Sequence, residues 1–382
     1  MTIIATSLRL ITALGVLLIS IGVAWFSYRS AIGNWDAILY VAGVLNISGL
    51  EGAELHRESY AVMRAAFDDA TFASLIGDPA ATSGHLHYRH TVYSDPESFE
   101  QMMPFYGGRV VYIRILSLIT PLVGGPVAAI QVLGATCAGA ITYLAGMLLI
   151  RGPRPLPLLL VLVALPLVVA ASGVITVGQL GTPDALSTLI VLMALMLLHS
   201  HRLAALILIA LLPLVRSDGV LLAALVGVLL LVERDRRAVH YALIGFALAL
   251  YLAIGVFSGG YGHLLLFNFT LLNGGPDPYP ATMEISTDLR AYLEVYFRRT
   301  IDFAPTLMPL LLILLVAAVD VRAMRNLVPM AVTTGLVITY AVSHFLLFPV
   351  GETRYYVFVL VYSTAYALKT LYAMASAPAA GT

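Results

Sequence analysis

The stretch that decides the fold is LRLITALGVLLISIGVAWFSYRSAIGNWDAILYV, at residues 8–41. Its first part, residues 8–26, is almost entirely apolar. A helix needs about 20 such residues to cross the hydrocarbon core of a bilayer, so this run predicts a membrane span. Asp36 follows shortly afterwards and opens a long polar stretch. A carboxylate just beyond the end of a membrane helix is well placed for chemistry at the membrane surface.

The composition of the whole chain agrees with a membrane location. The 382 residues are 60% hydrophobic and only 11% charged, and the mean hydropathy is +0.92. A soluble domain carries about 25% charged residues. Only helices and closed barrels satisfy all backbone polar groups in lipid, and the apolar runs here are too long for barrel strands. The sequence therefore predicts an all-α polytopic membrane protein, with residues 1–382 as a single transmembrane domain.

Charge and cysteine content exclude several kinds of partner and site. The net charge is zero and the chain has no strong basic block, so nothing indicates a nucleic-acid partner. The single cysteine, Cys137, cannot form an intrachain disulfide and cannot build a thiolate-rich metal site. The first apolar span has no A-x-A type cleavage site before the loop, which favours a retained anchor over a signal peptide.

Ten apolar runs predict ten transmembrane helices. They lie at about residues 8–26, 125–150, 155–176, 183–199, 202–216, 218–232, 239–257, 303–319, 327–348 and 355–375. Arginine is carried by four short connections, at residues 151–154, 199–202, 233–237 and 320–325. With the N-terminus in the cytoplasm, all four lie on the cytoplasmic face, as the positive-inside rule requires. We therefore expect an integral protein of the inner (cytoplasmic) membrane with both termini in the cytoplasm.

This threading places two long segments, residues 28–105 and 258–302, on the extracytoplasmic (periplasmic) side. Apolar spacing in the first segment predicts an amphipathic helix over 51–77, lying on the membrane surface. A second helix is expected over 104–122, where Arg109 favours an interfacial position over a full span. The chain shows no matching halves with paired broken helices, which argues against a secondary transporter.

Ionisable residues at the edges of apolar spans are costly, and they are therefore functional candidates. In the threading above, all of these candidates lie on the extracytoplasmic face, and we expect the functional site there. Four clusters stand out: Asp36, Asp184, the pair Arg216 and Asp218, and the pair Glu352 and Arg354.

Each cluster also has a purely structural interpretation. Asp36 is either the N-cap of the following helix or a general base near the membrane surface. Asp184 follows a proline at the start of a span, where a carboxylate compensates the helix dipole. Arg216 and Asp218 can simply neutralise each other between two short helices. Arg354 is either an exposed interfacial arginine or a phosphate clamp, since a guanidinium group binds phosphate oxygens bidentately.

Three histidines in the segment HLHYRH invite a zinc interpretation: His85, His87 and His90. Their spacing fits no strong ligand pattern, and the segment has no cysteine nearby. The preferred interpretation is a solvated loop segment.

Several segments together resemble the GT-C class of integral-membrane glycosyltransferases. GNWDAILYVAGVL, residues 33–45, is similar to the acidic start of the first extracytoplasmic loop of that class, and PFYGGRVVYIRILSLITPLVGG, residues 104–125, to its interfacial helix. GTPDALSTLIVLMAL and LVRSDGVLLAALVGVLLL, residues 181–195 and 214–231, resemble its recurring span entrances. GETRYYVFVLVYS, residues 351–363, resembles its late arginine–tyrosine segment. The similarity of layout covers nearly the whole chain.

The resemblance implies an inverting transfer of a hexose or pentose from a polyprenyl-phosphate-linked donor to an acceptor hydroxyl at the extracytoplasmic face. The acceptor would be a glycan, a lipid or a protein. The resemblance places Asp36 at the catalytic carboxylate. It implies that arginines bind the donor phosphate, and the candidates are Arg354, Arg216 and Arg109. Candidates for a second acid or for acceptor binding are Glu51, Asp184, Asp218, Glu352 and Tyr355.

No resident cofactor is expected, and a divalent metal stays open as an alternative. Many members of the class carry paired acids in the first loop, whereas Asp36 lies between Trp35 and Ala37, which argues against a metal-bridging carboxylate pair. Two other function classes also stay open. One is a transporter or flippase of a lipid-linked or small polar substrate, and the other is a noncatalytic scaffold with the same layout.

Overall fold

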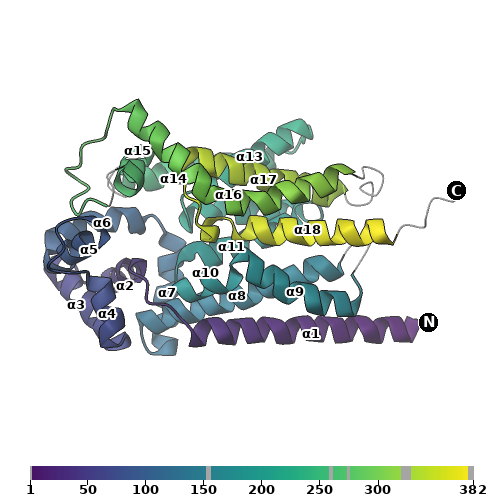
Figure 1. The fold of residues 1–382 in the computed structure, drawn as a ribbon, viewed down its shortest axis with the longest axis horizontal. Coiled ribbons are helices and arrows are strands. Elements are labelled where there is room, and N and C mark those ends of the chain that lie inside the picture. The colour runs from purple at the N-terminus through teal and green to yellow at the C-terminus, as the bar shows by residue number, and fades with distance from the viewer. Residues whose placement is uncertain (1, 152–155, 258–260, 273–275, 320–327, 377–382) are drawn as a thin grey trace.

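All assigned elements are helices in the computed structural model, which describes the chain except for residues 1, 152–155, 258–260, 273–275, 320–327 and 377–382. A helix is present wherever an apolar run predicts a span. These helices are α1 (Thr2–Arg29), α8 (Pro126–Ile150), α9 (Leu158–Ser172), α11 (Pro183–Leu197), α12 (Arg202–Leu211), α13 (Gly219–Val232), α14 (Ala238–Phe257), α16 (Leu289–Val319), α17 (Val328–Leu347) and α18 (Val357–Ala375). Figure 1 shows α1, α16, α17 and α18 running along the long axis of the molecule.

Four of these helices are long and apolar enough to cross a membrane on their own: α1, α8, α14 and α18. Two bent pairs raise the number to six if each pair is one span. The pairs are α6 (Pro96–Gly107) with α7 (Val110–Val123), and α9 with α10 (Val174–Leu180). Several other apolar helices have only 10–17 residues, whereas a full crossing takes about 20. An all-helical, membrane-embedded protein is therefore supported, and the predicted count of ten spans is not confirmed.

The two ends of the molecule differ in what they carry. α1 begins and α18 ends at one end, and the helices of the first long loop lie at the other (Figure 1). Arg202 pairs with Glu233 at 2.7 Å and with Asp235 at 2.9 Å, which joins two of the arginine-bearing connections as the predicted threading requires. The connection at 320–325 and most of the connection at 151–154 lie outside the described residues.

Glycines allow α1 to lie close against α8. A Cβ atom added at Gly139 on α8 would come within 2.9 Å of both the carbonyl oxygen of Ser20 and the Cβ atom of Ala24 on α1. One added at Gly146, two turns further on, would lie 2.4 Å from the Val16 side chain. The two backbones therefore approach closely enough for the van der Waals packing that holds helices together in lipid.

Gly139→Ala is expected to destabilise the protein by about 1–3 kcal/mol, because the added methyl group meets backbone atoms that cannot easily move aside. The matched control is Gly22→Ala on α1, since nothing lies within 4 Å of a Cβ atom built there. That control should leave stability unchanged or raise it slightly, since alanine favours the helix. Thermal unfolding in detergent measures both variants. Equal melting temperatures would contradict the close α1–α8 contact.

The first long loop folds into five short helices, not two. They are α2 (Asp36–Ile47), α3 (Gly52–Ala66), α4 (Asp69–Ile76), α5 (Gly84–Ser94) and α6. The segment 51–77, which was predicted to be one helix, is therefore helical over most of its length but is interrupted between α3 and α4. Asp68 makes the interruption, because its side chain caps α4 by accepting the Thr71 backbone N–H at 2.9 Å.

Two predictions for this region are wrong. The histidine segment lies in α5 and not in a solvated loop, because Tyr88 and Val92 give it a buried face. The single helix predicted over 104–122 is two helices, α6 and α7, which meet at 104°. The glycine pair Gly107–Gly108 explains the break, since glycine weakens helix interiors. Arg109 stands at the corner, with a backbone conformation outside the helical region.

The second long loop packs onto the first through α6. The Tyr279 hydroxyl donates to the Asp95 carboxylate at 2.6 Å, and the Ser98 hydroxyl donates to the Pro278 carbonyl oxygen at 2.6 Å. Asn268 holds the loop from within, because its buried side chain donates to the Tyr292 hydroxyl at 2.7 Å. The two extracytoplasmic segments expected from the sequence therefore form one connected structure.

Asp95 gives this contact a pH dependence. The hydrogen bond from Tyr279, followed by the one from the Glu97 backbone N–H, lowers the pKa of Asp95 below its ordinary range. Such a group contributes stability above the pKa it has when unfolded, about 4, and the contribution is lost as the pH falls through the lowered value. The hydrogen bond to Asp95 also raises the pKa of Tyr279 to about 12, so the contact weakens again as the pH rises through that value.

We therefore expect the contact to hold between about pH 4 and pH 10 and to loosen on either side. Hydrogen exchange of residues 276–288 measures it, with Tyr279→Phe compared at each pH to remove the intrinsic pH effect on exchange. The natural chain should be better protected than the variant inside this window, and the difference should vanish below it. A difference that persists in strong acid would contradict the role of Asp95.

Candidate functional site

Asp36 is the first residue of α2 and lies one position after the N-cap residue, Trp35. One carboxylate oxygen accepts a hydrogen bond from the Tyr106 hydroxyl at 2.7 Å. The other lies 3.4 Å from the Arg354 guanidinium group. The side chain of Asp36 remains 26% exposed. The N-cap interpretation is therefore wrong: the carboxylate is held between a phenol and a guanidinium group and keeps an open side.

Burial of α2 fixes the position of this carboxylate. Residues 37–44 of the helix are buried. A Cβ atom added at Gly43 would lie 2.9 Å from Ile113, so α2 and α7 are in close contact. Just before α2, the Asn34 side chain donates a hydrogen bond to the Leu180 carbonyl oxygen at 3.4 Å. It also accepts a hydrogen bond from the backbone N–H of Asp36 at 3.1 Å. The start of α2 is thus tied to α10 in the helix bundle.

Arg354 reaches the site from the other end of the sequence. It lies in a short 3-10 helix, Thr353–Tyr355, immediately before α18. Its Nε lies 2.6 Å from the Glu352 carboxylate, so two acids share one guanidinium group. The Tyr355 ring contacts two guanidinium groups, because those of Arg354 and Arg216 each lie 4.9 Å from its centroid. Cation–π contacts of this kind are worth about 0.5–2 kcal/mol each, and here they link two charged clusters.

Arg216 is the centre of a buried ion cluster. It binds Asp218 bidentately, with two N–O distances of 2.9 Å, and it pairs with Asp184 of α11. Asp184 is only 3% exposed and accepts a further hydrogen bond from Thr182. His344 of α17 approaches the Asp218 carboxylate to 3.3 Å. The interpretation of Arg216 and Asp218 as a neutralising pair is confirmed, and Asp184 belongs to the same cluster.

Arg109 reaches the site through tyrosines. It donates to the Tyr40 hydroxyl, and its guanidinium group lies 4.7 Å from the centroid of the Tyr106 ring. The Tyr40 hydroxyl in turn interacts electrostatically with Asp36 and with the other two arginines of the site. Three guanidinium groups therefore lie around this carboxylate, and the acids bound to Arg354 and Arg216 offset their charge.

The structure brings the four predicted clusters together at one place. Asp36 contacts Arg354. The Tyr355 ring connects that arginine with Arg216 and its two aspartates. These contacts join segments from α2, α11, the start of α13 and the start of α18. The grouping that the threading predicted from charge at span edges is therefore observed.

The candidate second acids do not share the position of Asp36. α2 has 12 residues, which extend about 18 Å at 1.5 Å per residue, and Glu51 follows its far end, beside Asn46. Glu51 therefore lies well away from Asp36, and its role as a second acid or in acceptor binding stays a prediction. Asp184, Asp218 and Glu352 are each paired with an arginine. Within the described part of the chain, no group of three or more His, Cys, Asp or Glu side chains could hold a metal ion.

A cavity of about 390 Å³ lies beside Arg354. Its opposite wall is the bend between α9 and α10, where the helix direction changes by 52°. Gly173 stands at this bend with a φ of +77°, which favours glycine, and an added Cβ atom would lie 3.0 Å from Thr353. Ala170 and Ala171 on the same wall are exposed. The guanidinium group therefore lines a cavity that has an apolar side at the surface of the helix bundle.

Sequence reasoning missed three residues of the site: Tyr40, Tyr106 and His344. For His344 a signal existed, since an ionisable residue inside a predicted span is a functional candidate by default. Tyr106 stands just before a glycine pair, but no local pattern connects it with a carboxylate 70 positions earlier in the chain.

No protein-family model, no curated protein and no solved structure matches this chain. Its function must therefore be argued from the site itself.

Proposed function

We propose that this chain is a membrane glycosyltransferase of the GT-C kind, which moves a sugar from a polyprenyl-phosphate-linked donor to an acceptor hydroxyl at the extracytoplasmic face. One observation carries the proposal. A partly exposed carboxylate, Asp36, lies beside an arginine that lines a cavity, Arg354. Inverting transfer from a lipid phosphate needs a base on one face of the anomeric carbon and an anion site on the other. The resemblance of five segments to that class adds support.

The residues of the site account for each step of the proposed transfer. Asp36 accepts the proton of the acceptor hydroxyl as a general base. The acceptor oxygen bonds to the anomeric carbon from the face opposite the phosphate. The bond from that carbon to the phosphate oxygen breaks and its electron pair leaves with the oxygen, so the configuration inverts. Arg354 stabilises the charge on the departing phosphate, and Arg109 adds a second guanidinium group near the site. The products are polyprenyl phosphate and the glycosylated acceptor.

The cavity beside Arg354 suits the donor phosphate. The guanidinium group supplies the matching charge, and the small residues of the opposite wall leave room for a lipid chain. Exposed Ala170 and Ala171 give that chain a path from the cavity to the surrounding lipid. A polyprenyl tail would then lie between helices while its phosphate stays at the membrane boundary.

Arg354→Lys should slow transfer by roughly ten- to a hundredfold. Lysine keeps the positive charge but loses the bidentate geometry, and a hydrogen bond to a charged group is worth about 1.5–3 kcal/mol. The measurement is the initial rate in proteoliposomes supplied with a panel of polyprenyl-phosphate sugars. Arg57→Lys is the control, because Arg57 lies exposed on α3. An unchanged rate in Arg354→Lys would contradict the phosphate clamp.

Mass spectrometry of membrane lipids and surface glycans tests the function as a whole. Cells that lack the protein should accumulate one lipid-linked sugar and lose the matching glycan. Re-expression of the natural chain should reverse both changes, and re-expression of an Asp36→Asn chain should reverse neither. Substrate flux through reconstituted vesicles without chemical turnover would instead indicate a transporter and contradict the proposal.

A further inference from the structure

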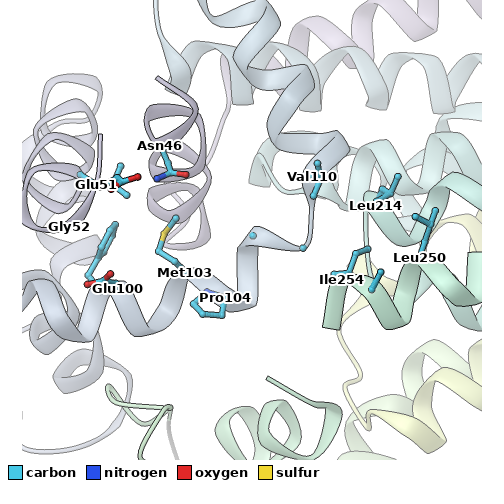
Figure 2. A pocket seen from close by; sticks show the side chains of 15 residues that line it. Asn46, Glu51, Gly52, Glu100, Met103, Pro104, Val110, Leu214, Leu250 and Ile254 are labelled. Atoms are coloured by element: carbon cyan, nitrogen blue, oxygen red, sulfur yellow. The ribbon is translucent and has the colours of Figure 1, made fainter. Parts of the chain in front are cut away.

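A second, larger cavity of about 850 Å³ lies at the far end of α2 from Asp36. The first-loop helices α3 and α6, together with the end of α2, form one side of it, and η1 (Leu212–Leu214) and α14 form the other. Figure 2 shows how its two ends differ. Polar side chains lie at one end and apolar side chains at the other: Asn46, Glu51 and Glu100 against Leu214, Leu250 and Ile254.

The apolar end belongs to a candidate membrane span. α14 is one of the four helices that can cross a bilayer alone, and Leu250, Ala253 and Ile254 lie in its last two turns. Neighbouring residues on the helix turn outward, since Leu252 is 67% exposed and Val256 is 74% exposed. This end of the cavity is therefore at the level of the lipid chains, and an apolar chain can enter it from the membrane.

The polar end selects against negative charge. Glu51 and Glu100 are exposed carboxylates at its rim, and no lysine or arginine is among the residues that line the cavity. Carboxylates accept hydrogen bonds from hydroxyl groups and repel phosphates. The cavity beside Arg354 differs, because it carries a guanidinium group together with the Glu352 carboxylate.

Helix α6 connects this cavity with Asp36. Met103, Pro104 and Gly107 line the cavity, and Tyr106 on the same helix donates a hydrogen bond to Asp36. A helix with its side chains is about 10 Å across, so the cavity and the carboxylate lie on two sides of a single helix.

We infer that this cavity binds a lipid with an uncharged, hydroxyl-bearing head group. The lipid chain occupies the apolar end against α14, and hydroxyl groups of the head donate hydrogen bonds to Glu51 and Glu100. This binding does not rest on the proposed function.

Photo-crosslinking in nanodiscs of neutral lipid tests the binding. The probe is an alkyl glucoside with a diazirine in its chain, and the comparison probe is a phosphatidic acid with the same chain. The glucoside should label residues 99–110 and 246–257 at least about tenfold more strongly than the phosphatidic acid, a ratio that a single unfavourable charge contact produces. Ala253→Trp fills the apolar end and should abolish most of this labelling. Leu252→Trp adds the same bulk at the neighbouring lipid-facing position and should leave the labelling unchanged.

A charge-reversed variant tests the polar end without filling the cavity. The double variant Glu51→Lys, Glu100→Lys should favour the phosphatidic acid, whereas Glu97→Lys on the same helix should not. Labelling that survives Ala253→Trp, equal labelling of the natural chain by both probes, or stronger labelling by an alkylammonium probe would each overturn the inference. An Asp36→Asn chain should still be labelled. If that chain also still transferred sugar, the role of Asp36 as the base would fail while the binding result stood.

Discussion

Replacing Asp36 by asparagine should lower the rate of sugar transfer by about 10²–10⁴-fold, the usual contribution of a positioned general base. Asparagine has nearly the same shape and can still accept the hydrogen bond from Tyr106, but its amide cannot take up the acceptor proton. The ion pair with Arg354 is also lost, so the arginine stays bound to Glu352 alone. Initial rates in proteoliposomes measure the effect, with the donor panel described above.

Two comparisons separate lost chemistry from lost structure. Asp36 is partly exposed and its neighbours remain in place, so the variant should insert and melt like the natural chain. Asp68→Asn makes the same chemical change at an exposed helix cap in the same loop and should keep full activity. Normal transfer by the Asp36→Asn chain would show that Asp36 is not the base of the reaction.

Arg216→Met should destabilise the protein by about 3–5 kcal/mol, the usual result when one partner of a buried ion pair is removed. The substitution leaves Asp184 and Asp218 close together and without their cation, and Asp184 is almost completely buried. Methionine fills much of the same volume, so the loss reflects charge more than packing. The free energy of unfolding in mixed detergent micelles measures it.

The matched control is Arg57→Met. Arg57 also has two acidic neighbours, Glu54 and Glu58, but its side chain is 67% exposed. Exposed pairs contribute about 0–1 kcal/mol, so this variant should be nearly as stable as the natural chain. Adding Asp184→Asn and Asp218→Asn to Arg216→Met should restore part of the lost stability, since no unpaired charge then remains. A loss below about 1 kcal/mol in Arg216→Met alone would show that water reaches the cluster freely.

The sequence predicted the charged residues of the candidate site better than their surroundings. Charges at span edges are rare and costly, so Asp36, Asp184 and Arg216 could be singled out one at a time. Their mutual contacts agree with the predicted threading, in which alternate span ends meet at the same face. Tyr106 could not be found this way, since a buried tyrosine carries no such signal before its partner is known.

Helix lengths were harder to predict than helix positions. A hydropathy window reports composition, and it continues across breaks that the backbone does not tolerate. The run at 202–216 contains Pro213, which lacks a backbone N–H, and α12 ends at Leu211 in a short 3-10 turn. The run at 155–176 is bent at Gly173. The helix α2 was not predicted from hydropathy, because its 12 residues are too few to be recognised as a membrane span.

The contact between Asp36 and Arg354 joins residues 318 positions apart. The carboxylate is therefore synthesised long before the arginine that pairs with it. Until α18 and the residues just before it have been made and inserted, Asp36 lacks this ion pair, and the cavity at Arg354 has only the wall formed by α9 and α10. The candidate site is therefore completed late in the assembly of the helix bundle.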